Sequence, residues 1–347
     1  MAVTLAAWVC WTTSSLNAMA TRGYSSYRGR NKGKIALIIA LVVILLAAVG
    51  FLVIQNYRVY DNEGNVHWNL PFMPHKETQE PDIDPNDVEI DRQEPQFVAG
   101  KDLTPLQAKE LPLWCLNDDP AWMLTDAPQS VVVNVKNADG ALLYSAKAAT
   151  PEGVSKGGEY TLANLRTILD SNHGTVARMA CLCDSAYARA MTEQAALCGE
   201  DGTLWWDPYG RCWLDPAKEG TLTYVKALCQ ELVTLGFDEI VLDYFGYPAS
   251  WQGNADRTAV LTQFMTALRE SLPEGTRISL LLREMPGAEN GLTAELLNAS
   301  FDRIYTDNGV NTETLIKMLP ANFDAATRLV PIVWRATENG SYMIATN

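Results

Sequence analysis

The stretch GFDEIVLDYFGYP, residues 236–248, decides the fold class that this chain predicts. An apolar run over residues 240–242 ends at Asp243, and two aromatic residues follow it. Gly236 stands before the run, where a helix would end, because glycine readily adopts the left-handed conformation of that position. This pattern is typical of a buried parallel strand that delivers one carboxylate to the rim of an α/β barrel, where barrel active sites lie. The alternative is a strand-end Asp that caps the next loop.

Composition favours a globular domain with an acidic surface. The chain has 347 residues, of which 48% are hydrophobic and 20% charged, so there is ample material for a core. The formal net charge is −14, and every one of the 41 acidic residues lies at Asp61 or beyond, against 21 basic residues in the same part. An acidic surface repels phosphate backbones, which argues against nucleic acid as a partner.

One segment near the N-terminus predicts a membrane anchor. Residues 35–54, IALIIALVVILLAAVGFLVI, contain no charge, and five basic residues precede them. That length spans a bilayer as a helix, and the basic flank puts the N-terminus in the cytoplasm. A cleaved signal peptide is the alternative, but its apolar part would be shorter. The predicted organisation is a basic cytoplasmic segment, a transmembrane signal anchor, an acidic proline-rich and largely disordered extracellular linker, and a barrel domain, at residues 1–34, 35–55, 56–102 and 103–347.

Strand and helix patterns alternate along the domain, which predicts a parallel sheet covered by helices. Strands are expected at 111–116, 130–135, 175–183, 240–243, 277–282, 301–305 and 328–334, with helices at 162–169, 219–235, 258–272 and 314–319. About 245 residues suit a (β/α)₈ TIM-like barrel. Seven strands leave it incomplete unless residues 342–345 add the eighth, and a doubly wound open sheet is the alternative.

Two carboxylates follow successive predicted strands and would meet at one rim. Asp243 ends one strand and Glu284 follows the next. Hydrolysis of a glycosidic bond needs such a pair, one as general acid and the other as nucleophile or base. The alternative is that Glu284 pairs with Arg283 or another surface cation. Other chemistries have little support: the domain has one histidine, His173, and no glycine-rich phosphate loop, so no cofactor or metal is predicted.

An aromatic loop provides candidate binding residues. The sequence LWWDPYGRCWLDP, residues 204–216, holds four large aromatic residues beside carboxylates and an arginine. Flat aromatic faces can stack on sugar rings, although loop or core packing is the commoner fate of any one tryptophan. Candidate substrate-binding residues from this loop and from the segment after Asp243 are Trp205, Trp206, Trp213, Asp215, Tyr244 and Tyr247. Cys198 and Cys212 flank the loop and are the first pair to consider for a disulfide, with small buried thiols as the alternative.

Four motifs together resemble a bacterial family of glycoside-hydrolase-like domains related to α-amylase-like barrels. They are VVVNVKNADGALLYSA at 131–146, ARMACLCDSAYA at 177–188, LWWDPYGRCWLDP at 204–216 and GFDEIVLDYFGYP at 236–248. The resemblance implies a barrel in which Asp243 takes the nucleophile position after the fourth strand and Glu284 is the acid/base. It also implies that Lys136, Arg178 and Asp215 line the cleft.

The chain departs from this family pattern at functional positions. The family tends toward Asp-Val-Lys-Asp where this chain has Asn134 to Asn137, and toward Asp-Tyr-Val-Arg-Phe-Pro where it has Gly246 in place of the Arg. The sequence therefore predicts a membrane-anchored extracellular glycoside hydrolase that acts on a polysaccharide or cell-envelope glycan. A catalytically inactive carbohydrate-binding or envelope-organising module is the alternative, and a structural ectodomain is a third. The oligomeric state is left open.

Overall fold

The chain forms two compact units, Met1–Asp91 and Arg92–Asn347. The computed structural model describes residues 41, 42, 45, 58–60, 66–68, 99–253 and 255–346. In the first unit, β1 (Arg58–Tyr60) and β2 (Val66–Trp68) form an antiparallel pair. This short ladder lies in the linker for which the sequence predicted no regular structure.

The predicted membrane helix lies outside the described residues, apart from positions 41, 42 and 45, which are helical. Within the part of the chain that the structure describes, no helix has both the length and the apolar character needed to cross a bilayer.

The second unit is built on a closed parallel barrel of eight strands within residues 99–346. The strands follow one another round the barrel in chain order, and the last pairs with the first. They are β3 (Gln107–Glu110), β4 (Ser130–Lys136), β5 (Gly174–Ala180), β6 (Glu239–Asp243), β7 (Arg277–Leu282), β8 (Ile304–Thr306), β9 (Leu329–Val333) and β10 (Tyr342–Ile344). The TIM-like barrel is thus confirmed and closed, and the open sheet is wrong.

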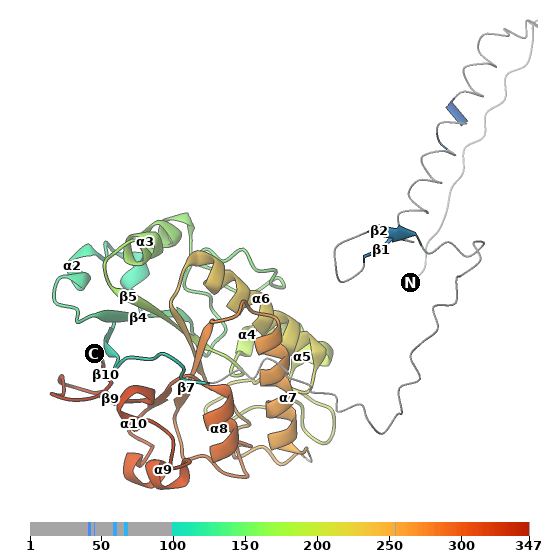
Figure 1. Ribbon diagram of the computed structural model, residues 1–347. Coiled ribbons are helices and arrows are strands. Elements are labelled where there is room, and N and C mark those ends of the chain that lie inside the picture. Colours follow the sequence, from blue (N-terminus) through green and yellow to red (C-terminus); the bar gives the residue numbers. More distant parts are fainter. Residues whose placement is uncertain are drawn as a thin grey trace, which may run out of the picture. The chain divides into compact units, whose positions relative to one another are not determined.

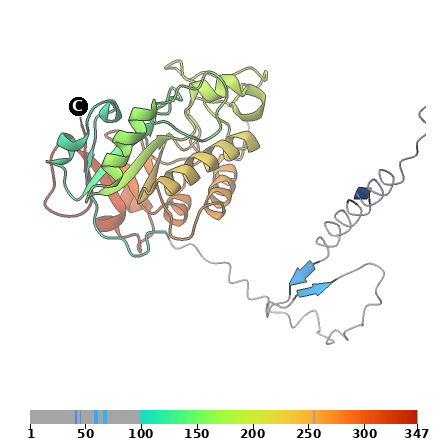
Figure 2. The ribbon, with the colours of Figure 1, turned by 90° about the horizontal axis from the view of Figure 1, so that it is seen from above.

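Helices surround the strands (Figures 1 and 2). They are η1 (Cys115–Asn117), α2 (Ala121–Leu124), α3 (Glu159–Leu169), α4 (Ser185–Ala190), α5 (Thr192–Ala195), α6 (Glu219–Leu235), α7 (Arg257–Glu270), α8 (Ala294–Ser300), α9 (Thr312–Met318) and α10 (Ala325–Arg328). The longest, α6, ends as the sequence predicted: Gly236 has φ 103° and its N–H donates to the carbonyls of Leu232 and Val233. That cap turns the chain directly into β6.

The first and last strands of the barrel have weak sequence signals, which explains why only seven strand candidates are clear. Residues 111–116 do not form the first strand; they lead into η1, and the strand is β3, whose sequence QAKE has one apolar side chain that is fully buried, Ala108. Short polar strands carry little apolar signal. The tail strand β10 pairs with both β3 and β9, and these pairings close the sheet.

The barrel interior has a middle layer of apolar side chains, one or more from every strand. The layer comprises Leu106, Ala108, Val132, Val176, Val241, Leu281, Tyr305, Val330 and Met343. Below it, Glu239 and Arg303 form a buried ion pair, and the hydroxyl of Tyr305 donates to Glu239 at 2.9 Å. Because side chains alternate along a strand, residues two positions further along each strand point into the opposite, C-terminal mouth.

The six described cysteines are all free thiols, so the Cys198–Cys212 disulfide is wrong. The loop folds into short antiparallel bridges in which Cys198 lies opposite Leu204, and Cys212 lies opposite Trp206. The two thiols therefore face different residues of the middle segment. Five of the six cysteines are buried, which agrees with the alternative prediction that they are small buried thiols.

Candidate functional site

A ring of polar side chains closes the C-terminal mouth of the barrel. Each of its members comes two residues after a side chain of the apolar middle layer, one from each of six successive strands. In order round the barrel, this charged ring consists of Glu110, Asn134, Arg178, Asp243, Arg283 and Asp307. The site thus follows from the alternation of side chains along each strand. The next inward-facing positions after the apolar middle layer hold polar side chains instead of apolar ones.

Asp243 lies at the centre of the ring and is held by two arginines. Arg178 donates through Nε and Nη2 to Oδ2 at 3.1 and 2.8 Å. Arg283 donates through Nε to Oδ1 at 2.7 Å and through Nη2 to Oδ2 at 2.8 Å. The backbone N–H of Tyr244 adds a fifth donor, to Oδ1 at 2.8 Å. A carboxylate offers about four lone-pair positions, so that of Asp243 is saturated.

The ring continues on both sides of the two arginines. Glu110 accepts hydrogen bonds from Nη1 of Arg178 and, at 2.8 Å, from the side-chain amide of Asn134. On the other side, Nη1 of Arg283 lies 3.4 Å from the carboxylate of Asp307. Positive and negative side chains alternate round the mouth, and three carboxylates against two guanidiniums leave one net negative charge.

Contacts within the ring shift the pKa values of Asp243, Arg178 and Arg283 so that the charged form of each is favoured. Burial of Asp243, which is 3% exposed, would by itself raise its pKa. The hydrogen bonds and charges of Arg283 and Arg178 outweigh burial and hold the pKa of Asp243 below its usual value. In turn, Asp243 raises the pKa of both arginines against the opposing effect of burial. A carboxylate with this environment is a permanent anion at neutral pH and a weak nucleophile.

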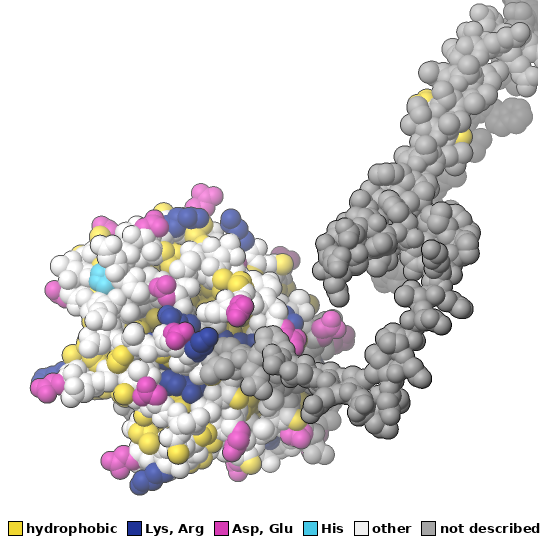
Figure 3. Space-filling view, viewed as in Figure 1, with side chains coloured by type: hydrophobic (Ala, Val, Ile, Leu, Met, Phe, Trp, Pro, Cys, Tyr) yellow, Lys and Arg dark blue, Asp and Glu magenta, His cyan; other side chains and the backbone are white. Residues whose placement is uncertain are grey.

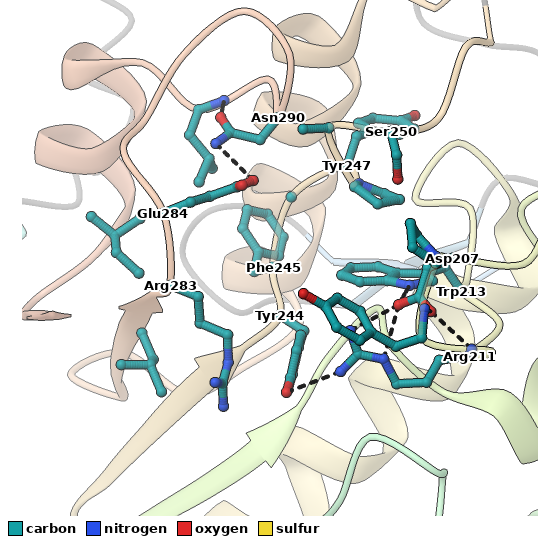
Figure 4. A pocket seen from close by; sticks show the side chains of 18 residues that line it. Asp207, Arg211, Trp213, Tyr244, Phe245, Tyr247, Ser250, Arg283, Glu284 and Asn290 are labelled. Carbon is teal, nitrogen blue, oxygen red and sulfur yellow. Dashed lines mark hydrogen bonds and ion pairs between the residues drawn. The ribbon is translucent and has the colours of Figure 1, made fainter. Parts of the chain in front are cut away.

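A cavity of about 540 Å³ opens beside the ring, over the ends of β6 and β7 (Figure 4). Aromatic and polar side chains both line it. Its walls include Asp207, Tyr209, Arg211, Trp213, Tyr244, Phe245, Tyr247, Arg283, Glu284 and Asn290. We call this space the main cavity. Asp243 does not line it, because Arg283 and Tyr244 lie over the carboxylate, with the guanidinium carbon 4.1 Å from the Tyr244 ring centre.

Glu284 is the accessible carboxylate of the main cavity. Its side chain is exposed and accepts one hydrogen bond, from the amide of Asn290 at 3.2 Å. Arg283, the alternative partner considered for it, is bound to Asp243 and Asp307 instead. Figure 4 shows Glu284 and Asn290 on one side of the cavity and Asp207 on the other. The two residues predicted as a catalytic pair are therefore in different environments, one open and one sealed.

The aromatic loop builds the opposite wall around a buried carboxylate. Asp207 binds the side chain of Arg211 at 2.8 Å and accepts from the indole N–H of Trp213 at 3.1 Å. These partners lower the pKa of Asp207 despite its burial. Trp213 meets the ring of Tyr244 edge-on, at 5.9 Å between centres. Asp207 thus has a structural role in shaping the loop, and the exposed face offered to a ligand is that of Tyr209, which is 83% exposed.

Several predicted binding residues lie away from the main cavity. Lys136 is buried, with its amine 2.9 Å from Asp184 and 2.6 Å from the carbonyl of Ala180. Trp205 packs against the core, and Trp206 is 49% exposed, but neither lines the cavity. Asp215 accepts from the backbone N–H of Ala217 and is likewise not in its wall.

Of the other predicted binding residues, Trp213, Tyr244 and Tyr247 do line the main cavity, and Arg178 belongs to the charged ring. Tyr247 stacks on Trp251 at 5.0 Å between ring centres. No group of three or more metal-ligating side chains occurs among residues 99–253 and 255–346 or in the other described segments.

The departures from the family pattern fit this arrangement. The amide of Asn134 donates to Glu110, whereas an Asp at that position would remove the donor and bring two carboxylates together. Gly246 has φ 128°, in the region that favours glycine, and a Cβ there would lie 3.2 Å from the carbonyl oxygen of Asn290. An Arg at this position would therefore be strained in this backbone.

Glu110 is a residue of the ring that the sequence did not predict, and neither did it predict its place beside Arg178. The residue lies at the end of β3, which the sequence did not identify as a strand. One signal could have identified it. Glu110 comes two residues after a buried interior side chain, Ala108, and the same spacing recurs on five other strands. That signal is readable only once the register of the strands is known.

A family model confirms the resemblance that the motifs indicated. The model of a family described as "Putative glycosyl hydrolase domain" matches residues 122–280. The match contains all four motifs and ends shortly before Glu284. None of the curated proteins matches the chain.

Three solved structures resemble part of this chain. A hypothetical protein from Ruminiclostridium thermocellum ATCC 27405 is 26% identical, with a TM-score of 0.43, over 50% of this chain and 96% of that protein. A cycloisomaltooligosaccharide glucanotransferase from Paenibacillus sp. is 14% identical, with a TM-score of 0.46, over 65% of this chain and 38% of its own length. A chitinase from Rhizomucor miehei is 15% identical, with a TM-score of 0.39, over 65% and 67% of the two chains.

Replacing Asp243 by Asn should destabilise the domain, because it leaves two enclosed guanidiniums without their anion. We expect a loss of about 3 kcal/mol in the free energy of unfolding at pH 7, measured by urea denaturation. The lowered pKa of Asp243 means that its stabilisation is present above about pH 4 and is lost as the pH falls through the folded-state pKa. The stability of the variant should therefore depend less on pH in this acid range.

The matched control is Asp126→Asn, since Asp126 is exposed and precedes β4 at the opposite end of the barrel. We expect this change to alter the free energy of unfolding by no more than about 0.5 kcal/mol. Equal stability of the Asp243 and Asp126 variants would contradict the role given to the ring.

Proposed function

We propose that this protein binds a glycan in the main cavity and that Asp243, behind the cavity wall, serves as a structural anion. The observation that carries the proposal is the saturation of Asp243 by five N–H donors. A two-carboxylate glycosidase needs a free nucleophile or base opposite the acid. An anion that is 3% exposed and absent from the cavity wall does not meet that need.

The lining of the main cavity supports a carbohydrate as its ligand. A volume of about 540 Å³ lies in the range of small-molecule sites. Tyr209 presents an exposed ring, and Arg211 lies over it at 5.0 Å, which fixes a flat aromatic surface beside a donor. Asn290, Ser250 and Glu284 add hydrogen-bonding groups to its lining. Aromatic faces with a few polar groups suit a sugar, which has apolar ring faces and polar edges.

Acidic and basic side chains are both scattered over the face of the barrel domain seen in Figure 3. This mixed surface supports a neutral glycan better than a polyanion. The match of residues 122–280 to a glycosyl hydrolase domain family adds support for a carbohydrate ligand.

Hydrolysis is the second candidate, and the open carboxylate of Glu284 favours it. A carboxyl group with one weak hydrogen bond in a cavity wall can donate a proton to a leaving oxygen. The second carboxylate would become available only if Arg283 left Asp243. Arg283 is the more exposed of the two arginines, at 34% against 15% for Arg178. Displacement of Arg283 from Asp243 by a substrate can therefore be tested separately from glycan binding.

Replacing Tyr209 by Ala should weaken binding of the cavity's glycan about fivefold, because it removes a stacking surface of about 1 kcal/mol. The measurement is a glycan array of bacterial and plant polysaccharides, followed by calorimetry with the best ligand. Tyr160→Ala is the control, since Tyr160 is a similarly exposed tyrosine on α3 and does not line the cavity. Equal losses in the two variants, or no glycan bound at all, would refute binding in this cavity.

Glu284→Gln should lower glycosidic hydrolysis by about 100-fold or more if the second candidate holds, because a Gln cannot donate the proton. The control is Glu289→Gln, an exposed glutamate of the same loop. The assay is release of reducing ends from the bound glycan. Two results together would leave glycan binding as the function. The unchanged protein would release no reducing ends, and the folded Asp243→Asn variant would still bind the glycan.

We also propose that residues 35–54 anchor the protein in the cell membrane, with the barrel domain outside the cell. The support is the uncharged stretch of twenty residues and the five basic residues before it. The full chain should stay in the membrane fraction after a high-salt wash, and protease added to intact cells should cleave the barrel domain from it. A chain lacking residues 35–54 should lose membrane association. If the protease cleaved the barrel domain only after lysis and not in intact cells, the proposed orientation would be wrong.

A further inference from the structure

A second, smaller hollow lies at the C-terminal mouth of the barrel, among residues at the ends of β3, β5, β8, β9 and β10. It has a volume of about 170 Å³ and is lined by Glu110, Arg178, Asp307, Ile332, Trp334 and Ala345, among others. Three of these side chains belong to the charged ring, and Ile332 and Ala345 lie two residues after the middle-layer residues of β9 and β10. We call this space the axial hollow.

The two carboxylates of the axial hollow have acceptor capacity that the protein does not use. Both donors that reach Glu110, from Arg178 and Asn134, bind the same oxygen, Oε1. Within the described part of the chain, no donor reaches Oε2 of Glu110. Asp307 accepts from its neighbour Asn308 through Oδ1, while Oδ2 has only the long 3.4 Å contact with Arg283. Two carboxylate oxygens therefore remain open to a donor in the hollow.

The positive charge of Arg178 is already neutralised. Its Nε and Nη2 are directed at Asp243, and its Nη1 at Glu110, so the guanidinium plane is committed within the ring. The ring as a whole keeps one net negative charge. A ligand in the axial hollow thus meets a negative potential and unused acceptors, which is the environment that attracts a cation.

Trp334 adds an aromatic surface to this environment. It follows β9, lines the hollow and is 64% exposed, so its indole is available to a ligand. Tryptophan is the aromatic side chain that attracts cations best, and ammonium groups are commonly bound between carboxylates and aromatic faces. A divalent metal is a poorer occupant, because Ca²⁺ requires six to eight oxygen ligands and the hollow offers the carboxylates of Glu110 and Asp307.

We propose that the axial hollow binds the ammonium group of an amino-sugar unit, so that the preferred glycan carries free amines. This inference rests on the proposed glycan binding and specifies its ligand class. The hollow is smaller than the usual range for drug-sized ligands, which suits about one sugar ring with its amine toward Glu110 and Asp307. The same sugar ring presents an apolar face to Trp334, which a simple amine does not.

The test compares a glucosamine tetramer with its N-acetylated counterpart, using the full chain and calorimetry at about pH 6, where an amine is charged. Acetylation removes the charge and keeps the sugar chain. We expect the amine form to bind at least about tenfold more tightly, as a charged hydrogen bond allows. Asp307→Asn and Glu110→Gln should reduce this preference to less than about threefold, while Glu274→Gln, at the opposite end of the barrel, should keep it.

Trp334→Ala should weaken the binding of both tetramers and leave the ratio of their affinities above about threefold, because stacking does not depend on the amine charge alone. Asp307→Asn is the variant that keeps the inference testable if Glu110→Gln unfolds, since Asp307 has only the long contact with the arginines. Thermal unfolding of each variant distinguishes lost binding from lost fold.

Each outcome bears on a different proposal. Equal binding of the two tetramers would overturn the amino-sugar site and leave glycan binding in the main cavity intact. Equal binding of a tetralysine peptide and the glucosamine tetramer would show that amine charge alone is recognised, which also overturns it. If neither tetramer nor any neutral glycan binds, both the amino-sugar site and the proposed function fail.

Discussion

The carboxylate of Asp243, held between two guanidiniums, organises the C-terminal half of the barrel. Its five donors join β5, β6 and β7 across the mouth, and the same arginines extend the contact to β3 and β8. Charges in a low-dielectric interior are tolerated only when each has partners of the opposite sign. That requirement explains why the ring alternates in charge and why replacing one member affects its neighbours.

The same requirement divides the mouth into two spaces. Arg283 and Tyr244 cover Asp243 on the side of the main cavity, and Arg178 covers it on the side of the axial hollow. The barrel therefore combines two open spaces with a carboxylate that lines neither of them. Glu284, which has no guanidinium partner within the described part of the chain, keeps the acceptor capacity that Asp243 has lost.

Much of the fold could be predicted from the chain. The helix over 219–235 and the strand over 277–282 are confirmed with the bounds that apolar periodicity gave, and the tail supplied the missing strand. The first strand could not be predicted, because Gln107 to Glu110 contain no apolar run. Of the site, Trp213, Tyr244 and Tyr247 could be placed near Asp243, but the burial of Lys136 could not, since its partner Asp184 lies on a different strand's loop.

The amino-acid sequence determined that Asp243 would stand at the C-terminal end of a buried parallel strand. The apolar run before it and the glycine cap of the preceding helix are local features, and local features specify local structure. Only the tertiary structure decided what surrounds that carboxylate. Arg178 and Arg283 are 65 and 40 residues away along the chain, and closure of the barrel brings both within 3.1 Å. No local pattern encodes such contacts, because they depend on the register of every strand between them.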